Sequence, residues 1–225
     1  MKSQNNIFSE VYRYLEQGSQ FVDKRHLTVI SWMVTALLSS QSLNQARWEP
    51  YVQSRAKQAN SYQRRWSRFF QNGRVGIEML YIPLILGAIQ TWKEKGERLY
   101  LAIDTTVLWN QYCFVYLAVV CGGRAVPLMW MGLEHGSASL AFDKYEPFLD
   151  RAKGYLQGFE NIMLLADRGF ANQLLIQWLR KNAWHWCIRL PSDTLIYGVR
   201  RRGFGYEARE LYPSKREACF YRNVQ

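Results

Sequence analysis

Cysteine is scarce in this sequence, and histidine is scarcer still. The 4 cysteines are scattered without a CxxC pair, and none of the 3 histidines stands at metal-ligand spacing. A disulfide framework and a zinc site of cysteine and histidine ligands both depend on such spacing. The sequence therefore predicts neither of them. We expect the cysteines to be buried free thiols and the histidines to be structural.

A long apolar run is also lacking. The longest one covers residues 27–38 and is interrupted by Thr28, Ser31 and Thr35, whereas a membrane span needs about 20 apolar residues. The run therefore predicts a buried helix. A secretory signal peptide would place an apolar stretch after a cationic start, and the N-terminus does not have this pattern. We expect a cytoplasmic protein without a membrane partner.

Acidic residues are in short supply relative to basic ones. Against 29 Lys and Arg there are 18 Asp and Glu, which gives a formal net charge of +11 and a pI of about 9.6. This excess favours a polyanionic partner, and basic residues interleaved with Tyr, Trp and Phe favour nucleic acid over an anionic membrane. The chain contains 48% hydrophobic and 21% charged residues. These proportions are typical of globular proteins and exclude disorder for most of its length.

Residues 1–92 are predicted to form a helical DNA-binding domain, because apolar side chains recur there at helical spacing. Its second half is strongly basic. The segment 62–70 predicts an amphipathic helix with Trp66, Phe69 and Phe70 packed inward. The outward side chains, which are expected to face DNA phosphates, are Arg64, Arg65 and Arg68. The alternative interpretation is a helix whose charged face is merely solvated.

Residues 93–191 change to a strand-rich pattern. Three runs rich in β-branched and aromatic residues are separated by short turns, one of them at Gly122-Gly123. A helix, a short apolar strand, a second helix and a last strand follow. The order β-β-β-α-β-α-β indicates an α/β core (α+β for the whole chain) with a ribonuclease H-like arrangement.

Two aspartates each interrupt an apolar strand of this core. Asp104 follows Leu101-Ala102-Ile103, and Asp167 follows Leu164-Leu165-Ala166. A charge in such a place is costly unless it is paired or bound to a cation. In the expected topology the two strands are neighbours, so the carboxylates meet at one edge of the sheet and form a divalent-metal site. The alternative is that each aspartate ends its strand by accepting hydrogen bonds from nearby backbone amides.

The residues around both aspartates resemble the acidic motifs of IS4-type DDE transposases. Ile103-Asp104-Thr105-Thr106 is similar to the first motif, and Ala166-Asp167-Arg168-Gly169-Phe170 to the second. The resemblance implies a core that binds Mg²⁺ (or Mn²⁺) between carboxylates and cuts and joins DNA by in-line phosphoryl transfer. It implies that Asp104 and Asp167 are catalytic metal ligands. Arg168 is expected either to hold a phosphate oxygen or to form a surface ion pair that fixes the next loop.

The sequence departs from that family after the last core strand. The family's third carboxylate lies in a Tyr-x2-Arg-x3-Glu-x6-Lys pattern on a helix, and this pattern does not occur here. We therefore expect residues 192–225 to be the start of a β-rich insertion that is cut short. The late carboxylates are interpreted as solvated charges: Asp193, Glu207, Glu210 and Glu217. The segment also predicts a basic loop that follows a DNA backbone, with Arg200, Arg201 and Arg202.

The leading prediction for function is DNA transposition, by metal-dependent strand cleavage and joining at transposon ends. The activity is expected to be impaired, because the third carboxylate is missing. The partner is then double-stranded DNA at the nucleoid, with a homodimer or a pair with full-length transposase as candidate assemblies. The alternative is a non-catalytic DNA-binding remnant that inhibits the full-length enzyme. A further hypothesis, a self-sufficient nuclease, requires another acid from Asp143, Glu146 or the C-terminal glutamates.

Overall fold

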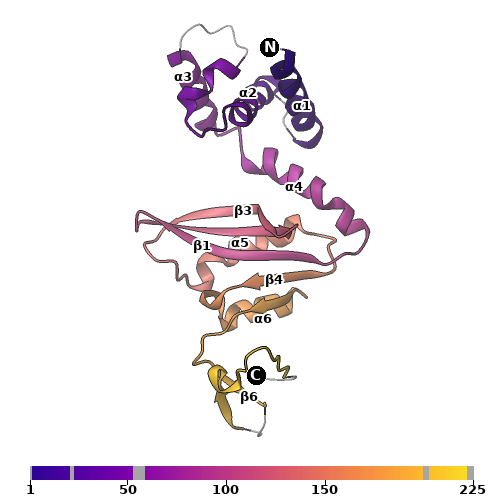
Figure 1. The fold of residues 1–225 in the computed structure, drawn as a ribbon, viewed down its shortest axis with the longest axis vertical. Helices are drawn as coiled ribbons and strands as arrows, with labels where there is room; N and C mark the ends of the chain where they lie inside the picture. Colours follow the sequence, from indigo (N-terminus) through magenta and orange to yellow (C-terminus); the bar gives the residue numbers. More distant parts are fainter. Residues whose placement is uncertain (1, 21–22, 53–58, 200–202, 222–225) are drawn as a thin grey trace. The chain divides into compact units, whose positions relative to one another are not determined.

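The chain forms two compact units, residues 1–91 and 92–225. The computed structural model describes residues 2–20, 23–52, 59–199 and 203–221. Figure 1 shows a first unit built of helices and a second unit built on a β-sheet. The boundary falls within helix α4 (Ile77–Glu94). Each unit is described by itself below.

The first unit is helical, as predicted. Its elements are α1 (Lys2–Gly18), α2 (Lys24–Ser40), the short 3-10 turns η1 (Gln45–Arg47) and η2 (Glu49–Tyr51), α3 (Ala59–Phe70) and most of α4. The start of α2 is fixed by Asp23, whose side chain accepts a hydrogen bond from the backbone amide of Arg25 at 2.9 Å. Such a cap satisfies one of the amides that the first turn of a helix leaves without a partner.

The core of this unit lies between α2, the two 3-10 turns and α3. Trp66 is fully buried there, beside Trp48 with ring centroids 6.1 Å apart. Two expectations are corrected. Phe70 is 61% exposed because Trp66 and Phe69 already fill the inward face, and the next residue points about 100° further round the helix. The apolar run 27–38 is helical but not buried all round, since Leu38 is 58% exposed.

The second unit contains a five-stranded sheet with two helices. The strands are β1 (Leu99–Leu108), β2 (Tyr112–Cys121), β3 (Arg124–Glu134), β4 (Ile162–Ala166) and β5 (His185–Ile188). Helix α5 (Phe142–Tyr155) precedes β4, and the 3-10 turn η3 (Arg168–Phe170) and helix α6 (Gln173–Lys181) follow it. The predicted glycine turn is present between β2 and β3, where Gly122 and Gly123 have φ values of 56° and 74°.

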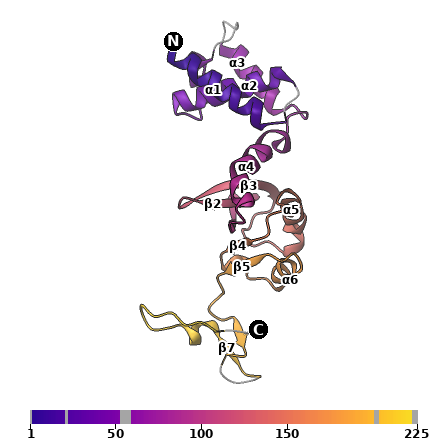
Figure 2. The ribbon, with the colours of Figure 1, turned by 90° about the vertical axis from the view of Figure 1, so that its right-hand side faces the viewer.

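The strand order is β3-β2-β1-β4-β5. Strands β1, β2 and β3 are antiparallel, and β4 runs parallel to both β1 and β5. Figure 2 shows α5 and α6 together on one face of this sheet. The order and the pairing confirm the predicted fold class, an α/β arrangement with a ribonuclease H-like core.

Residues after β5 form a small separate sheet. Strand β6 (Leu195–Tyr197) pairs antiparallel with β7 (Gly205–Glu207), and the 3-10 turn η4 (Ala208–Leu211) follows. The predicted basic loop thus falls between two paired strands. Its three arginines, Arg200, Arg201 and Arg202, lie outside the described residues, as do Arg55 and Lys57 of the basic front segment.

The cysteines are free thiols, but the prediction that they are buried is wrong for all except Cys113. Cys121, Cys187 and Cys219 are exposed, because they lie at a strand end, on a short edge strand and in the C-terminal segment. Among the helices within the described ranges, none has both the length and the apolar character needed to cross a bilayer.

Candidate functional site

Asp104 and Asp167 directly follow the last paired residues of one ladder. The parallel pairing of β1 with β4 ends where Ile103 lies opposite Ala166, and the two aspartates are the next residues on their strands. Neighbouring strands are about 4.8 Å apart. The carboxylates therefore start from adjacent backbone positions at the centre of the sheet.

Both aspartates are exposed. In β1, Leu99, Leu101 and Ile103 are buried and Asp104 is exposed, because successive side chains of a strand point to opposite faces. Asp167 follows β4 as the N-cap residue of η3, one position beyond the last paired residue, and it is exposed as well. Both carboxylates are accessible to a ligand.

Each carboxylate also accepts a local backbone hydrogen bond. Asp104 Oδ1 accepts from the amide of Thr105 at 2.8 Å, and Asp167 Oδ1 accepts from the amide of Gly169 at 2.9 Å, capping η3. This is the alternative role expected from the sequence, and it uses one oxygen of each group. Within the described part of the chain, no hydrogen bond to either Oδ2 is present. Local capping therefore leaves one oxygen of each carboxylate for a cation.

The lack of a side chain at Gly169 suits this arrangement. A Cβ at this position would lie 3.1 Å from Asp167 Oδ1, which is tighter than an ordinary van der Waals contact, and 3.9 Å from its Cγ. The glycine lets the amide approach the carboxylate and so fixes the Asp167 side chain. This gives the glycine of the Asp-Arg-Gly-Phe motif a physical reason.

A small hollow of about 230 Å³ adjoins Asp167. Thr105, Gly169 and Phe170 line one part of it, and residues 138–140 of the β3–α5 loop line the rest. The loop is tied to β1, because Thr105 Oγ1 donates a hydrogen bond to the carbonyl of Ala138 at 3.1 Å. The role of this loop was not predicted from the sequence. The residue that could have indicated it is Gly136, because a Cβ there would come within 2.7 Å of the Asn110 carbonyl.

Buried aromatic packing supports the hollow. The Phe170 ring is buried against Tyr145 of α5, edge to face, with centroids 5.7 Å apart. Burial raises the pKa of Tyr145 to about 12, because desolvation disfavours the charged phenolate. Packing of η3 on α5 thereby holds the loop that carries Asp167 and Arg168.

The donor set at this site fits a hard divalent cation. Mg²⁺ takes oxygen ligands, and proteins often bind it through one or two carboxylates together with water and substrate phosphates. Asp104 and Asp167 supply two such carboxylates. In the described ranges there is no group of three or more His, Cys, Asp and Glu side chains placed to hold a metal ion. The metal-ligand role of the two aspartates stays a prediction.

Arg168 is the first residue of η3 and is exposed. Its guanidinium makes no ion pair within the part of the chain that the structure describes. The surface ion pair that was one of its two expected roles is therefore not seen there. Its phosphate-binding role stays a prediction.

The carboxylates that follow the last core strand differ in their environments. Asp193 and Glu217 are exposed, as expected for solvated charges. Glu207 and Glu210 instead close a reciprocal cap on η4, in which Glu210 Oε2 accepts from the Glu207 amide at 2.7 Å. Glu207 is also paired with Arg209. The interpretation of Glu207 and Glu210 as merely solvated is thus corrected to a capping role.

In the first unit, a basic hollow of about 420 Å³ lies between α2 and α3. It is lined on the α3 side by Arg64, Arg65 and Arg68, the three residues predicted to contact DNA. Arg64 and Arg68 are exposed. The Arg65 guanidinium lies over the Trp32 ring, 5.2 Å from its centroid. The three arginines are therefore not equivalent.

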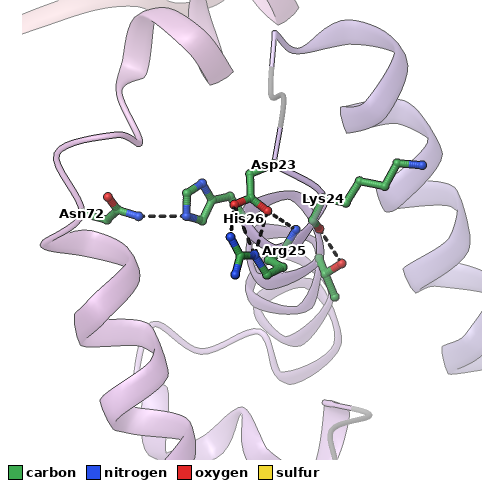
Figure 3. A network of polar contacts seen from close by, with 6 residues as sticks. Asp23, Lys24, Arg25, His26 and Asn72 are labelled. Carbon is green, nitrogen blue, oxygen red and sulfur yellow. Dashed lines mark hydrogen bonds and ion pairs between the residues drawn. The ribbon is translucent and has the colours of Figure 1, made fainter.

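The rim of this hollow is fixed by a bond between segments far apart in the sequence. Asn72 Nδ2 donates to His26 Nε2 at 2.8 Å, and Asn72 Oδ1 accepts from the Arg74 amide at 3.0 Å. Figure 3 shows this bond beside the Asp23–Arg25 pair at the start of α2. The hydrogen bond from the Arg25 side chain is the main cause that lowers the pKa of Asp23 to about 2. His26 is structural, as expected.

Comparison with known proteins connects the second unit to a family. Residues 111–220 match the family model of the transposase DDE domain, a range that contains Asp167 and begins after Asp104. Among curated proteins no sequence matches the chain. A solved structure described as an Aquifex aeolicus member of the Ppx/GppA family aligns over 42% of this chain and 36% of its own, with 16% identity and a TM-score of 0.24, a likeness too weak to carry an argument. The family match covers just under half of the chain and shows that its second unit is similar to the transposase DDE domain.

Proposed function

We propose that this chain is an IS4-type DDE transposase core that acts on double-stranded DNA at transposon ends by metal-dependent phosphoryl transfer. The proposal rests on two exposed carboxylates, Asp104 and Asp167, that directly follow the last paired residues of the neighbouring strands β1 and β4. The sequence around Asp167, Ala-Asp-Arg-Gly-Phe, supports the IS4 assignment. The match of residues 111–220 to the transposase DDE domain supports the reaction class.

The residues at this site would have different roles. Asp104 and Asp167 would hold Mg²⁺ or Mn²⁺, which supplies Lewis-acid stabilisation of phosphate oxygens and lowers the pKa of bound water. Gly169 orients Asp167, and the Thr105–Ala138 hydrogen bond holds the loop beside it. Arg168, exposed and next to Asp167, would bind a non-bridging phosphate oxygen of the DNA strand.

We further propose that these 225 residues bind DNA and cut it slowly. In-line displacement requires that the attacking and leaving oxygens are both held in place by metal ions. Two carboxylates provide fewer protein ligands to a divalent ion than three carboxylates do, so they position it less well. A misplacement of about 1 Å can lower a rate on the order of a hundredfold. The competing proposal, a non-catalytic DNA-binding protein that inhibits a full-length enzyme, predicts no cleavage under any metal condition.

The metal site can be tested without catalysis by Fe²⁺-directed hydroxyl-radical cleavage of the protein backbone. Iron bound in place of Mg²⁺ should cut the chain near residues 104 and 167. Asp104→Asn and Asp167→Asn should each lose these cuts. Glu160→Gln is a matched control, because Glu160 is an exposed carboxylate just before β4, at the other end of the strand from Asp167. Identical cleavage in all four proteins would remove the metal site.

The reaction class is tested on duplex DNA that carries the sequences flanking the gene. We expect binding of the duplex and weak Mn²⁺-dependent nicking that both Asp→Asn variants abolish. Strong nicking that both variants abolish would mean that one of the late carboxylates serves as the third catalytic acid. These are Asp193, Glu207, Glu210 and Glu217. A chain that does not bind duplex DNA at all would contradict the proposed function.

A further inference from the structure

The outward ridge of α3 carries side chains suited to reading base pairs. The buried residues of this helix are Tyr62, Trp66 and Phe69. At 100° per residue the positions directly opposite them are 60, 64, 67 and 71. They are occupied by Asn60, Arg64 and Ser67 of α3 and by Gln71 of the turn directly after it, all exposed. Every side chain on this ridge can therefore form hydrogen bonds with a ligand.

The ridge has the dimensions of a groove-binding element. From Asn60 to its last residue, Phe70, the helix rises about 15 Å, which is the length of roughly four to five base pairs. The major groove is about 12 Å wide and admits one α-helix. There Arg pairs with guanine, Asn or Gln pairs with adenine, and Ser accepts either role. The four residue types at these positions, Asn, Arg, Ser and Gln, are thus ones that can discriminate between base edges.

The charge pattern of α3 argues against a merely solvated face. A solvated helix surface is usually stabilised by opposite charges three or four residues apart, but α3 contains no Asp or Glu. Arg64 and Arg68 are instead like charges at i and i+4, which weaken an isolated helix. In the described ranges, no hydrogen bond or ion pair engages the side chains of Asn60, Arg64, Ser67 or Arg68. A polyanion would relieve this repulsion.

Both exposed arginines of α3, Arg64 and Arg68, border two hollows. The α2–α3 hollow is lined by them together with Ser61, His26 and Asn72. A second hollow, lined by Asn60, Gln63, Arg64, Ser67 and Arg68, follows the ridge itself. We propose that α3 enters the major groove and reads base edges through Asn60, Arg64, Ser67 and Gln71, while Arg68 and the α2–α3 hollow receive a backbone phosphate. This inference rests on the proposed function, since it presumes a duplex DNA partner.

Selection from a random-sequence duplex library with the full chain tests this inference. The wild-type chain should enrich a motif of about five base pairs. Asn60→Ala, Arg64→Gln and Ser67→Ala should each relax the preference at one or two positions, by roughly 5- to 150-fold for a bidentate contact, and leave the fold unchanged by circular dichroism. Asn6→Ala is the matched control, because Asn6 is an exposed asparagine of α1; it should leave the motif intact.

The outcomes distinguish the inference from the function on which it rests. Salt-sensitive binding without an enriched motif would overturn base reading by α3 and leave the proposed function standing. The same follows if a motif is enriched but the three ridge variants do not alter it. Failure of the chain to bind any duplex would instead overturn the proposed function itself.

Discussion

The three arginines of α3 should respond differently when each is replaced by glutamine. All three line the α2–α3 hollow, but Arg64 also stands on the outward ridge, Arg68 lies at the flank of that ridge, and Arg65 lies over Trp32. From the sequence, all three were expected to face phosphates. The structure predicts instead that only Arg68 acts as a simple phosphate contact.

The magnitudes follow from counterion release. Each neutralised phosphate contributes about −0.9 to the slope of log affinity against log salt concentration. Arg68→Gln should reduce the slope by about 0.9, so the affinity lost between 50 and 200 mM salt becomes smaller by about 3.5-fold. Arg65→Gln should leave the slope nearly unchanged and lower stability by about 0.5–1 kcal/mol, the value of a partly exposed cation–π contact. Arg64→Gln should chiefly change sequence preference.

Fluorescence anisotropy on a labelled duplex across a salt series measures these slopes, and urea denaturation measures the stability term. Arg13→Gln serves as the control, because Arg13 is an exposed arginine of α1 that is already paired with Glu10. Equal slope changes for Arg64, Arg65 and Arg68 would refute the assignment. So would an unchanged slope for Arg68→Gln.

Two further predictions concern the second unit. Gly169→Ala would place a Cβ 3.1 Å from Asp167 Oδ1 and should weaken Fe²⁺-directed cleavage near residue 167, whereas Gly154→Ala, with nothing within 4 Å of the added Cβ, should not. Tyr145 has a pKa raised by burial from 10.0 to about 12, so its stabilising contribution is complete below pH 10 and is lost as the pH rises toward 12. Urea titrations of Tyr145→Phe should therefore show a smaller loss of stability over that pH range than the wild-type chain, and equal losses would contradict this cause.

The adjacency of the two aspartates could be inferred from the sequence because it depends on local patterns. Alternation in β1 indicated that Leu99, Leu101 and Ile103 face inward, and their burial confirms it. Helix α5 joins β3 to β4, which are not neighbours in the order β3-β2-β1-β4-β5. The pairing of β1 with β4 was expected instead from the ribonuclease H-like topology that the order of the elements indicated.

The surroundings of the pair could not be inferred, because they depend on contacts distant in sequence. The Thr105–Ala138 hydrogen bond joins residues 33 positions apart, and no periodicity marks it. The place of Arg65 over Trp32 likewise depends on how α3 packs on α2. Phe70 was assigned to the core by its apolar character alone, although its position on the helix lies outside the inward face. Composition identifies which side chains can be buried, and geometry selects among them.

Unequal strand lengths explain why a site can exist at this point of the sheet. Strand β1 continues to Leu108 in its pairing with β2, but β4 stops at Ala166. Among the described residues, no strand pairs with this edge of β1 beyond Ile103, and the chain turns from Asp167 into η3 instead. Thr105, Asp167 and Gly169 line a hollow at this point. A ligand could therefore reach Asp167 without displacing a ladder hydrogen bond of the sheet, and under the proposed function this ligand is a DNA strand.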